Sequence, residues 1–151
     1  MSDIAGALGF LLGSFAGVEE TPPSAWTAGG RSDATAHGEL AVGGRVLVQR
    51  QTQHTGGAET FAAHNVFTTD PQTGEIVSYS FDSVGFLPEP PARGTMADGL
   101  LRLERTTERG SSLAVYRPLV AAFEWSKSFR VRPEDPWQLV VSGLLRVVPD
   151  R

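Results

Sequence analysis

The sequence predicts an all-β protein, a single antiparallel up-and-down barrel of about eight to ten strands with a short N-terminal helix. Alternating strand patterns recur along the chain at short intervals. Gly, Pro or Asp turn signals separate these patterns from one another. No linker or internal repeat divides the 151 residues, so we expect one domain with one core over residues 1–151.

The chain opens on a short apolar segment. Ser2-Asp3 is typical of a helix N-cap, and Ile4–Leu12 predicts a helix whose apolar face could plug one end of a barrel. The stretch Ala5–Ala16 is too short to cross a membrane, and it lacks the basic segment that precedes a signal peptide core. The chain has no cysteine, which agrees with a reducing compartment. We therefore expect a cytoplasmic protein.

Ten strands are expected after this segment. The first is Ser14–Glu20, followed by a Pro-, Gly- and Ser-rich loop at Thr21–Asp33 with Trp26 folded inward. The other nine are Ala34–Leu40, Arg45–Gln53, Thr60–Thr69, Glu75–Asp82, Arg93–Ala97, Leu100–Glu108, Ser111–Leu119, Phe123–Arg132 and Trp137–Val148. Asp98-Gly99 is a strong two-residue hairpin signal, because both positions of such a turn need positive φ.

Two strands show how the faces divide. In Phe123–Arg132, Phe123 and Trp125 alternate with polar residues, as in a strand that is buried on one face. In Arg45–Gln53, Gln49 shares its face with Leu47. A mixed face is expected where a barrel interior is partly polar, and it also occurs on an edge strand.

An ordered series of short segments is similar to a known family. The segments are LGFLLGSFAG at 8–17, GGRVLVQRQ at 43–51, HNVFTTDPQTG at 64–74, YSFDSVG at 79–85, and Gly94 with Asp98-Gly99. Together they resemble a bacterial domain-of-unknown-function family of lipocalin-like barrels in the calycin superfamily. Nitrobindins and fatty-acid-binding proteins are broader structural relatives of that family. The resemblance implies an internal cavity capped by the N-terminal segment.

The chain departs from these relatives at two places. Gly13-Ser14-Phe15 resembles the opening Gly-x-Trp signature of calycins but carries Phe in place of Trp. Nitrobindins bind haem through a histidine near the C-terminus, whereas the last histidine here is His64. The haem site therefore does not carry over, and we expect no cofactor.

Five residues are candidates for ligand contacts: Gln49, His64, Tyr79, Arg117 and Trp125. Tyrosines that face a cavity commonly hold the polar end of a ligand, although they also line cores. In fatty-acid-binding relatives an inward arginine with a tyrosine holds a carboxylate, and Arg117 shares a face with apolar residues. It also precedes a proline, so it could instead lie at a strand end with its head in water.

His64 and Asp82 could form a polar pair. A hairpin that turns at residues 70–74 brings position 64 close to position 80, so the two side chains could approach diagonally. An imidazole oriented by a carboxylate can act as a general base or bind a polar ligand. A structural hydrogen bond between strands is the alternative. The three histidines lack metal-ligand spacing, so we expect no metal site.

The expected function is binding of a small, mainly apolar molecule with a polar or anionic end, packed against Trp125, Phe67 and Phe81. One alternative is a small barrel enzyme of the isomerase or cyclase type that uses His64 with Asp82. A second alternative is a structural or homodimeric barrel with a filled core. The net charge of −4 gives no reason to expect nucleic acid as a partner, and we expect no membrane partner.

Overall fold

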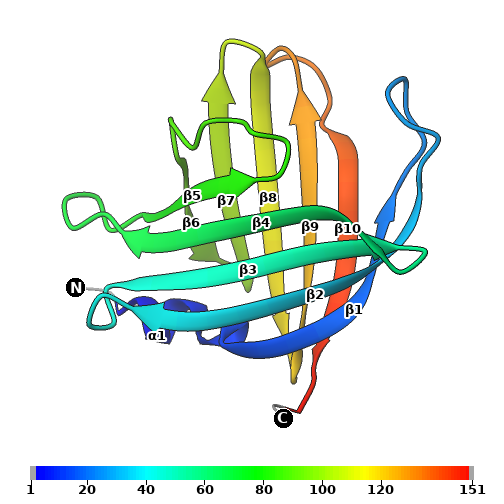
Figure 1. Cartoon of the computed structure of the whole chain (residues 1–151). Coiled ribbons are helices and arrows are strands. Elements are labelled where there is room, and N and C mark those ends of the chain that lie inside the picture. Colours follow the sequence, from blue (N-terminus) through cyan, green and yellow to red (C-terminus); the bar gives the residue numbers. More distant parts are fainter. Residues whose placement is uncertain (1–2, 150–151) are drawn as a thin grey trace.

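The computed structural model describes residues 3–149, which form one closed antiparallel barrel of ten strands preceded by a short helical segment (Figure 1). The elements are α1 (Ile4–Leu8), the 3-10 helix η1 (Gly9–Leu11), β1 (Gly13–Thr21), β2 (Gly30–Ala41), β3 (Val46–Thr55), β4 (Ala58–Thr69), β5 (Ile76–Asp82), β6 (Ala92–Ala97), β7 (Leu100–Thr107), β8 (Gly110–Leu119), β9 (Ala122–Arg130) and β10 (Gln138–Val147). Each strand pairs with its neighbours in the chain, and β1 pairs with β10 to close the sheet. The predicted fold class is confirmed.

The hairpin of β1 and β2 is longer than predicted. β2 begins at Gly30, which pairs with Thr21, so only the residues between them form the loop. The long hairpin arm extends away from the other strands (Figure 1). Its tip carries Trp26, which is 72% exposed. The inward position predicted for Trp26 is therefore wrong, because the loop projects away from the core.

The turn between β6 and β7 is the one that the sequence predicted. Asp98 and Gly99 have φ values of 54° and 75°, and the two residues join strands that pair from Ala97 and Leu100 onward. Positive φ at both central positions matches the right-handed twist of the flanking strands.

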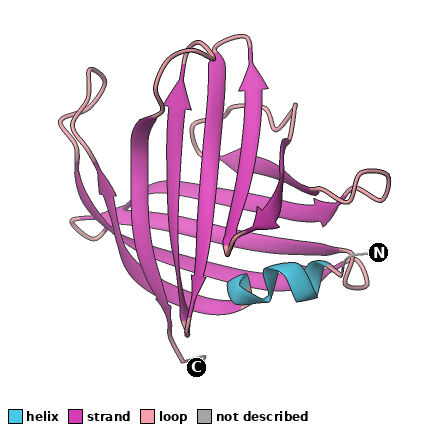
Figure 2. Cartoon of the chain, turned by 180° about the vertical axis from the view of Figure 1, so that it is seen from behind, coloured by secondary structure: helices cyan, strands magenta, loops and turns pink. Residues whose placement is uncertain are grey.

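The helical segment closes one end of the barrel (Figure 2). The Asp3 side chain accepts a hydrogen bond from the Ala5 backbone N–H at 3.1 Å, and the helix continues only as a 3-10 turn after Leu8. Leu8 and Leu11 are fully buried. A Cβ atom at Gly38 of β2 would lie 2.0 Å from the Leu11 carbonyl oxygen, so glycine permits this close packing. Within residues 3–149, no helix is long and apolar enough to cross a membrane.

An aromatic core fills the barrel next to this plug. Phe123 is fully buried, and its ring centroid lies 5.0 Å from that of Phe15 and 6.3 Å from those of Phe10 and Tyr116. Phe67 is also fully buried and meets Tyr116 edge-on at 6.1 Å. This half of the barrel is packed by its own side chains, and the free interior space lies beyond Tyr116.

Candidate ligand-binding site

A cavity of about 340 Å³ occupies the barrel interior above the aromatic core. Its wall includes the rings of Tyr116 and Trp125, which stack with centroids 6.1 Å apart and an interplanar angle of 20°. Residues of every strand except β2 line the rest, and the segment 83–91 between β5 and β6 borders it with Val84, Phe86 and Pro88. The volume falls in the usual range for small-molecule sites. The interior is therefore not filled by its own side chains.

A second hollow, of about 600 Å³, lies against β1, β2, β9 and β10. Its lining includes the charged side chains of Glu20, Arg31 and Arg146, and all three residues are exposed. It is an open surface groove, although its volume exceeds that of the interior cavity. The interior cavity is the better candidate because it is the more enclosed of the two and combines apolar and polar walls.

A buried amide network crosses three strands on one side of the barrel. Asn65 of β4 donates to the side-chain oxygens of Gln49 and Gln51 on β3, at 3.0 and 2.9 Å, and accepts from the Ser80 hydroxyl of β5 at 2.7 Å. Gln49 is fully buried, and Gln51 lines the cavity. The Nε2 atoms of both glutamines have no acceptor among the described residues.

A buried carboxylate fixes the orientation of Trp125. Glu19 of β1 is only 4% exposed and accepts from Trp125 Nε1 at 2.5 Å and from Gln53 Nε2 at 2.6 Å. Burial raises the pKa of Glu19, and the hydrogen bonds from Gln53 and Trp125 oppose that shift. A Cβ atom at Gly143 would lie 2.7 Å from Glu19 Cγ and 3.1 Å from Trp125 Nε1. Glycine at this position therefore leaves room for the hydrogen bond.

Three charged side chains line the cavity: Asp82, Arg105 and Lys127. Arg105 donates from Nη2 to the backbone oxygens of Leu87 and Glu89, at 2.8 and 3.1 Å, and so ties the segment 83–91 to β7. Burial lowers the pKa of Lys127; the charge of Asp82 opposes this shift and that of Arg105 adds to it. The cavity thus carries two cationic side chains and one acid.

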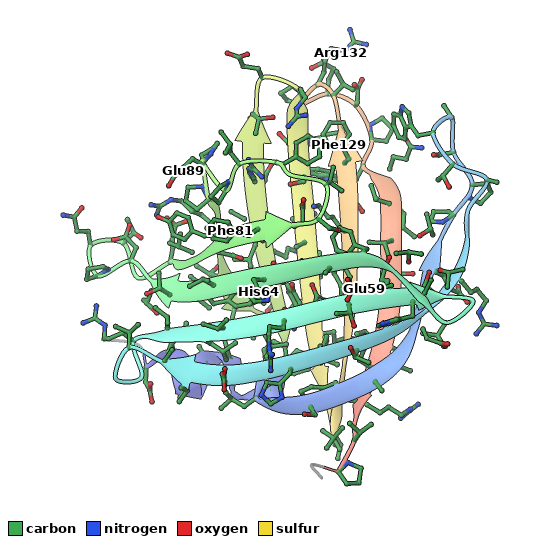
Figure 3. All side chains as sticks on the ribbon, viewed as in Figure 1. Glu59, His64, Phe81, Glu89, Phe129 and Arg132 are labelled. Carbon is green, nitrogen blue, oxygen red and sulfur yellow. The ribbon has the colours of Figure 1, made fainter. Side chains whose placement is uncertain are left out.

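The structure separates the five residues predicted as ligand contacts. Gln49 and Trp125 face the interior. His64 is exposed on β4 (Figure 3). Tyr79 of β5 pairs with Val66, and alternation along the strand places it on the outer face. Arg117 forms an ion pair with Glu124 at 2.5 Å, and its side chain is 53% exposed. The inward position suggested for Arg117 is wrong. Adjacent residues of a strand point to opposite faces, and the neighbouring Tyr116 is the one that faces the cavity.

The predicted pair of His64 and Asp82 does not form. The register pairs His64 with Phe81 and Ala63 with Asp82, so the side chains of His64 and Asp82 point to opposite faces of the sheet. A shift of one residue from the expected pairing is enough to cause this. Phe81 likewise faces outward and is 53% exposed, which corrects its expected role in the cavity wall. The arrangement on which the enzyme alternative depended is absent.

Sequence reasoning missed Lys127, Arg105 and Glu19. Lys127 lies two residues after Trp125, so the alternation that places Trp125 inside also places Lys127 inside. Arg105 shares its face with the buried Leu103. The signal was therefore present in the pattern, although charged residues are rarely expected on an inward face. Among residues 3–149, no group of three or more His, Cys, Asp and Glu side chains is arranged to hold a metal ion.

Comparisons with known proteins inform the fold. No protein-family model matches the chain, and no curated protein sequence matches it. Among solved structures, the crystal structure of Rv2717c from M. tuberculosis is similar, with a TM-score of 0.75, 16% sequence identity and 99% of each chain covered. At this identity the likeness concerns the fold alone. It fits the lipocalin-like barrel that the sequence predicted.

Proposed function

We propose that the barrel binds a small, mainly apolar molecule whose hydrogen-bond-accepting or anionic end lies inside the cavity. One observation carries the proposal: the enclosed space of about 340 Å³ has a stacked Tyr116–Trp125 wall and nitrogen donors in the same lining. Binding sites for small molecules commonly combine an apolar surface with a few fixed polar groups.

The apolar wall supplies most of the affinity. Tyr116, Trp125, Leu103, Ala114 and Val141 contribute apolar surface to the cavity. Burial of about 250 Å² of ligand surface at about 25 cal/mol per Å² contributes roughly 6 kcal/mol. The cost of immobilising the ligand reduces this gain, whereas a preformed cavity keeps that cost low. Because about 6 kcal/mol corresponds to a dissociation constant of about 40 μM, we expect dissociation constants of tens to hundreds of micromolar once this cost is included.

The polar groups favour an acceptor. Gln51 Nε2 and Arg105 Nε have no acceptor among the described residues, and both side chains line the cavity. A buried donor without a partner costs about 1–3 kcal/mol, so a ligand oxygen that small side-chain rotations bring into reach would recover part of this cost. Arg105 and Lys127 also outnumber Asp82, which favours an anionic end over a cationic one.

Dodecanoate and the naphthalene dye ANS, both amphipathic anions, are suitable probes. We expect isothermal titration calorimetry to give dissociation constants of tens to hundreds of micromolar for at least one of them. Ala114→Phe fills the cavity from the inner face of β8 and should weaken binding at least about tenfold, whereas Leu113→Phe on the outer face should leave it unchanged. His64→Ala and Arg117→Ala should also bind as the wild type does.

Native mass spectrometry of protein taken directly from cells provides an independent readout. A co-purifying small molecule that is lost from Ala114→Phe would support the proposal. Circular dichroism verifies that both phenylalanine variants are folded. If no small molecule co-purifies and neither probe binds the wild type, or if Ala114→Phe binds as tightly as Leu113→Phe, the cavity is not the binding site.

A further inference from the structure

The basic residues of this chain are distributed unusually. Of the thirteen lysine and arginine residues, only Lys127 is a lysine. It lies on β9 between Ala114 of β8 and Val141 of β10, which are its register partners, and all three residues line the cavity. The other twelve basic residues are arginines, and the one lysine lies inside the barrel.

Lysine and arginine differ in one property that matters here. A guanidinium stays protonated under all conditions that a protein tolerates, whereas an ammonium can lose its proton and become a nucleophilic amine. Lysines in desolvated pockets beside another cation are activated in this way. Lys127 and Arg105 line the same cavity, and the barrel wall around Lys127 lowers its pKa, although the lysine itself is exposed rather than buried.

The amine of Lys127 is also free to react. Within residues 3–149 it makes no hydrogen bond and no ion pair, although its side chain is accessible from the cavity. Arg105, by contrast, is held by the Leu87 and Glu89 carbonyl groups. The remaining charged residue of the lining is Asp82, a carboxylate. Burial, the charge of Arg105 and the opposing charge of Asp82 together leave the pKa of Lys127 below its ordinary value.

We propose that Lys127 captures an aldehyde or ketone ligand covalently, as a reversible imine inside the barrel cavity. The amine nitrogen attacks the carbonyl carbon and forms a C–N bond. The carbonyl oxygen then leaves as water, whose two hydrogens come from the amine, and a C=N bond remains. The reaction needs no oxidant or reductant, and hydrolysis reverses it. This assignment rests on the proposed function, because the apolar part of the same ligand would lie against Trp125 and Tyr116.

Reductive trapping tests the assignment on the full chain. The protein is incubated with hexanal or cinnamaldehyde near neutral pH in the presence of sodium cyanoborohydride, which converts an imine to a stable secondary amine. Intact mass and peptide mapping then locate the adduct, and the N-terminal amine serves as an internal standard. We expect the adduct at Lys127 to form at least about tenfold faster in the folded protein than in the urea-unfolded chain, because the cavity holds the carbonyl beside an activated amine.

Two variants make the result specific. Ala114→Phe should abolish the folded-state adduct at Lys127, and Leu113→Phe should preserve it. If the folded protein gives no adduct at Lys127, or if Ala114→Phe is labelled as fast as the wild type, the imine assignment is overturned. Calorimetry with dodecanoate separates the two proposals. If dodecanoate binds but no adduct forms, the proposed function stands and only the imine is overturned. If dodecanoate does not bind and no adduct forms, both proposals are overturned.

Discussion

The hydrogen bond between Trp125 and Glu19 gives the most direct test of how the cavity wall is held. Trp125→Phe keeps an aromatic ring beside Tyr116 but removes the indole N–H that Glu19 accepts. Glu19 is 4% exposed, so water cannot readily replace the lost donor. Only the bond from Gln53 would remain to the buried carboxylate.

The size of the effect depends on whether Glu19 is ionised. A hydrogen bond to a charged group contributes about 1.5–3 kcal/mol and one to a neutral group about 0.5–1.5 kcal/mol. The smaller ring adds a packing loss of about 1 kcal/mol that does not depend on pH. We therefore expect Trp125→Phe to lower the free energy of unfolding by about 3 kcal/mol at about pH 7. Because burial raises the pKa of Glu19 above 4.5, the group is mostly protonated at about pH 4, and the loss there should shrink to about 2 kcal/mol.

Urea unfolding followed by far-ultraviolet circular dichroism measures both values without relying on tryptophan fluorescence. Trp26→Phe is the matched control, since Trp26 is 72% exposed, and it should change the free energy of unfolding by less than about 0.5 kcal/mol at either pH. A loss for Trp125→Phe below about 1 kcal/mol at about pH 7, or an equal loss at both pH values, would refute the reasoning about the Glu19 carboxylate.

Further predictions concern the packing around the cavity. Phe123→Ala should lower the free energy of unfolding by about 4 kcal/mol and the melting temperature by roughly 8–16 °C, whereas Phe81→Ala on the outer face should cost less than about 1 kcal/mol; similar losses would contradict the core assignment. Gly143→Ala should cost about 1–3 kcal/mol in urea unfolding, because its Cβ atom would meet Glu19, and a neutral effect would show that the strand has room. Asn65→Ala should cost about 3 kcal/mol, because two glutamine oxygens and a serine hydroxyl lose their partner; a loss under about 1 kcal/mol would mean that the network does not stabilise the fold.

The fold could be predicted because its signals are local. Turn residues mark nearly every strand boundary, and the two-residue turn at Asp98-Gly99 fixes a register within a few residues. The length of the β1–β2 hairpin could not be predicted in the same way. Residues Gly30 to Asp33 carry no strand pattern of their own, and they are extended only because β1 supplies hydrogen-bond partners across the hairpin.

The site was harder to predict because face assignment depends on exact register. A loop of uncertain length between β4 and β5 leaves the pairing of His64 open by one residue, and one residue exchanges the inner and outer faces. Gln49 could be placed inside because it lies two residues after Leu47, on the same face of the strand, and Leu47 is fully buried. Lys127 follows from the same rule applied to Trp125, but a charge on an inward face makes sense only once the interior is known to contain a cavity.

The two halves of the interior have opposite physical characters, and this division is what makes a polar cavity possible in so small a domain. The half next to the helical plug buries Leu8, Leu11 and Phe123 completely and supplies the hydrophobic stabilisation. The other half lowers stability, since it holds an unpaired Gln51 donor and the ionisable Lys127, which an apolar core would exclude. A fold selected only for stability would fill this space with apolar side chains. Donors that lack a partner in the cavity, such as Gln51 Nε2, and that a ligand oxygen would satisfy therefore support the proposed binding function.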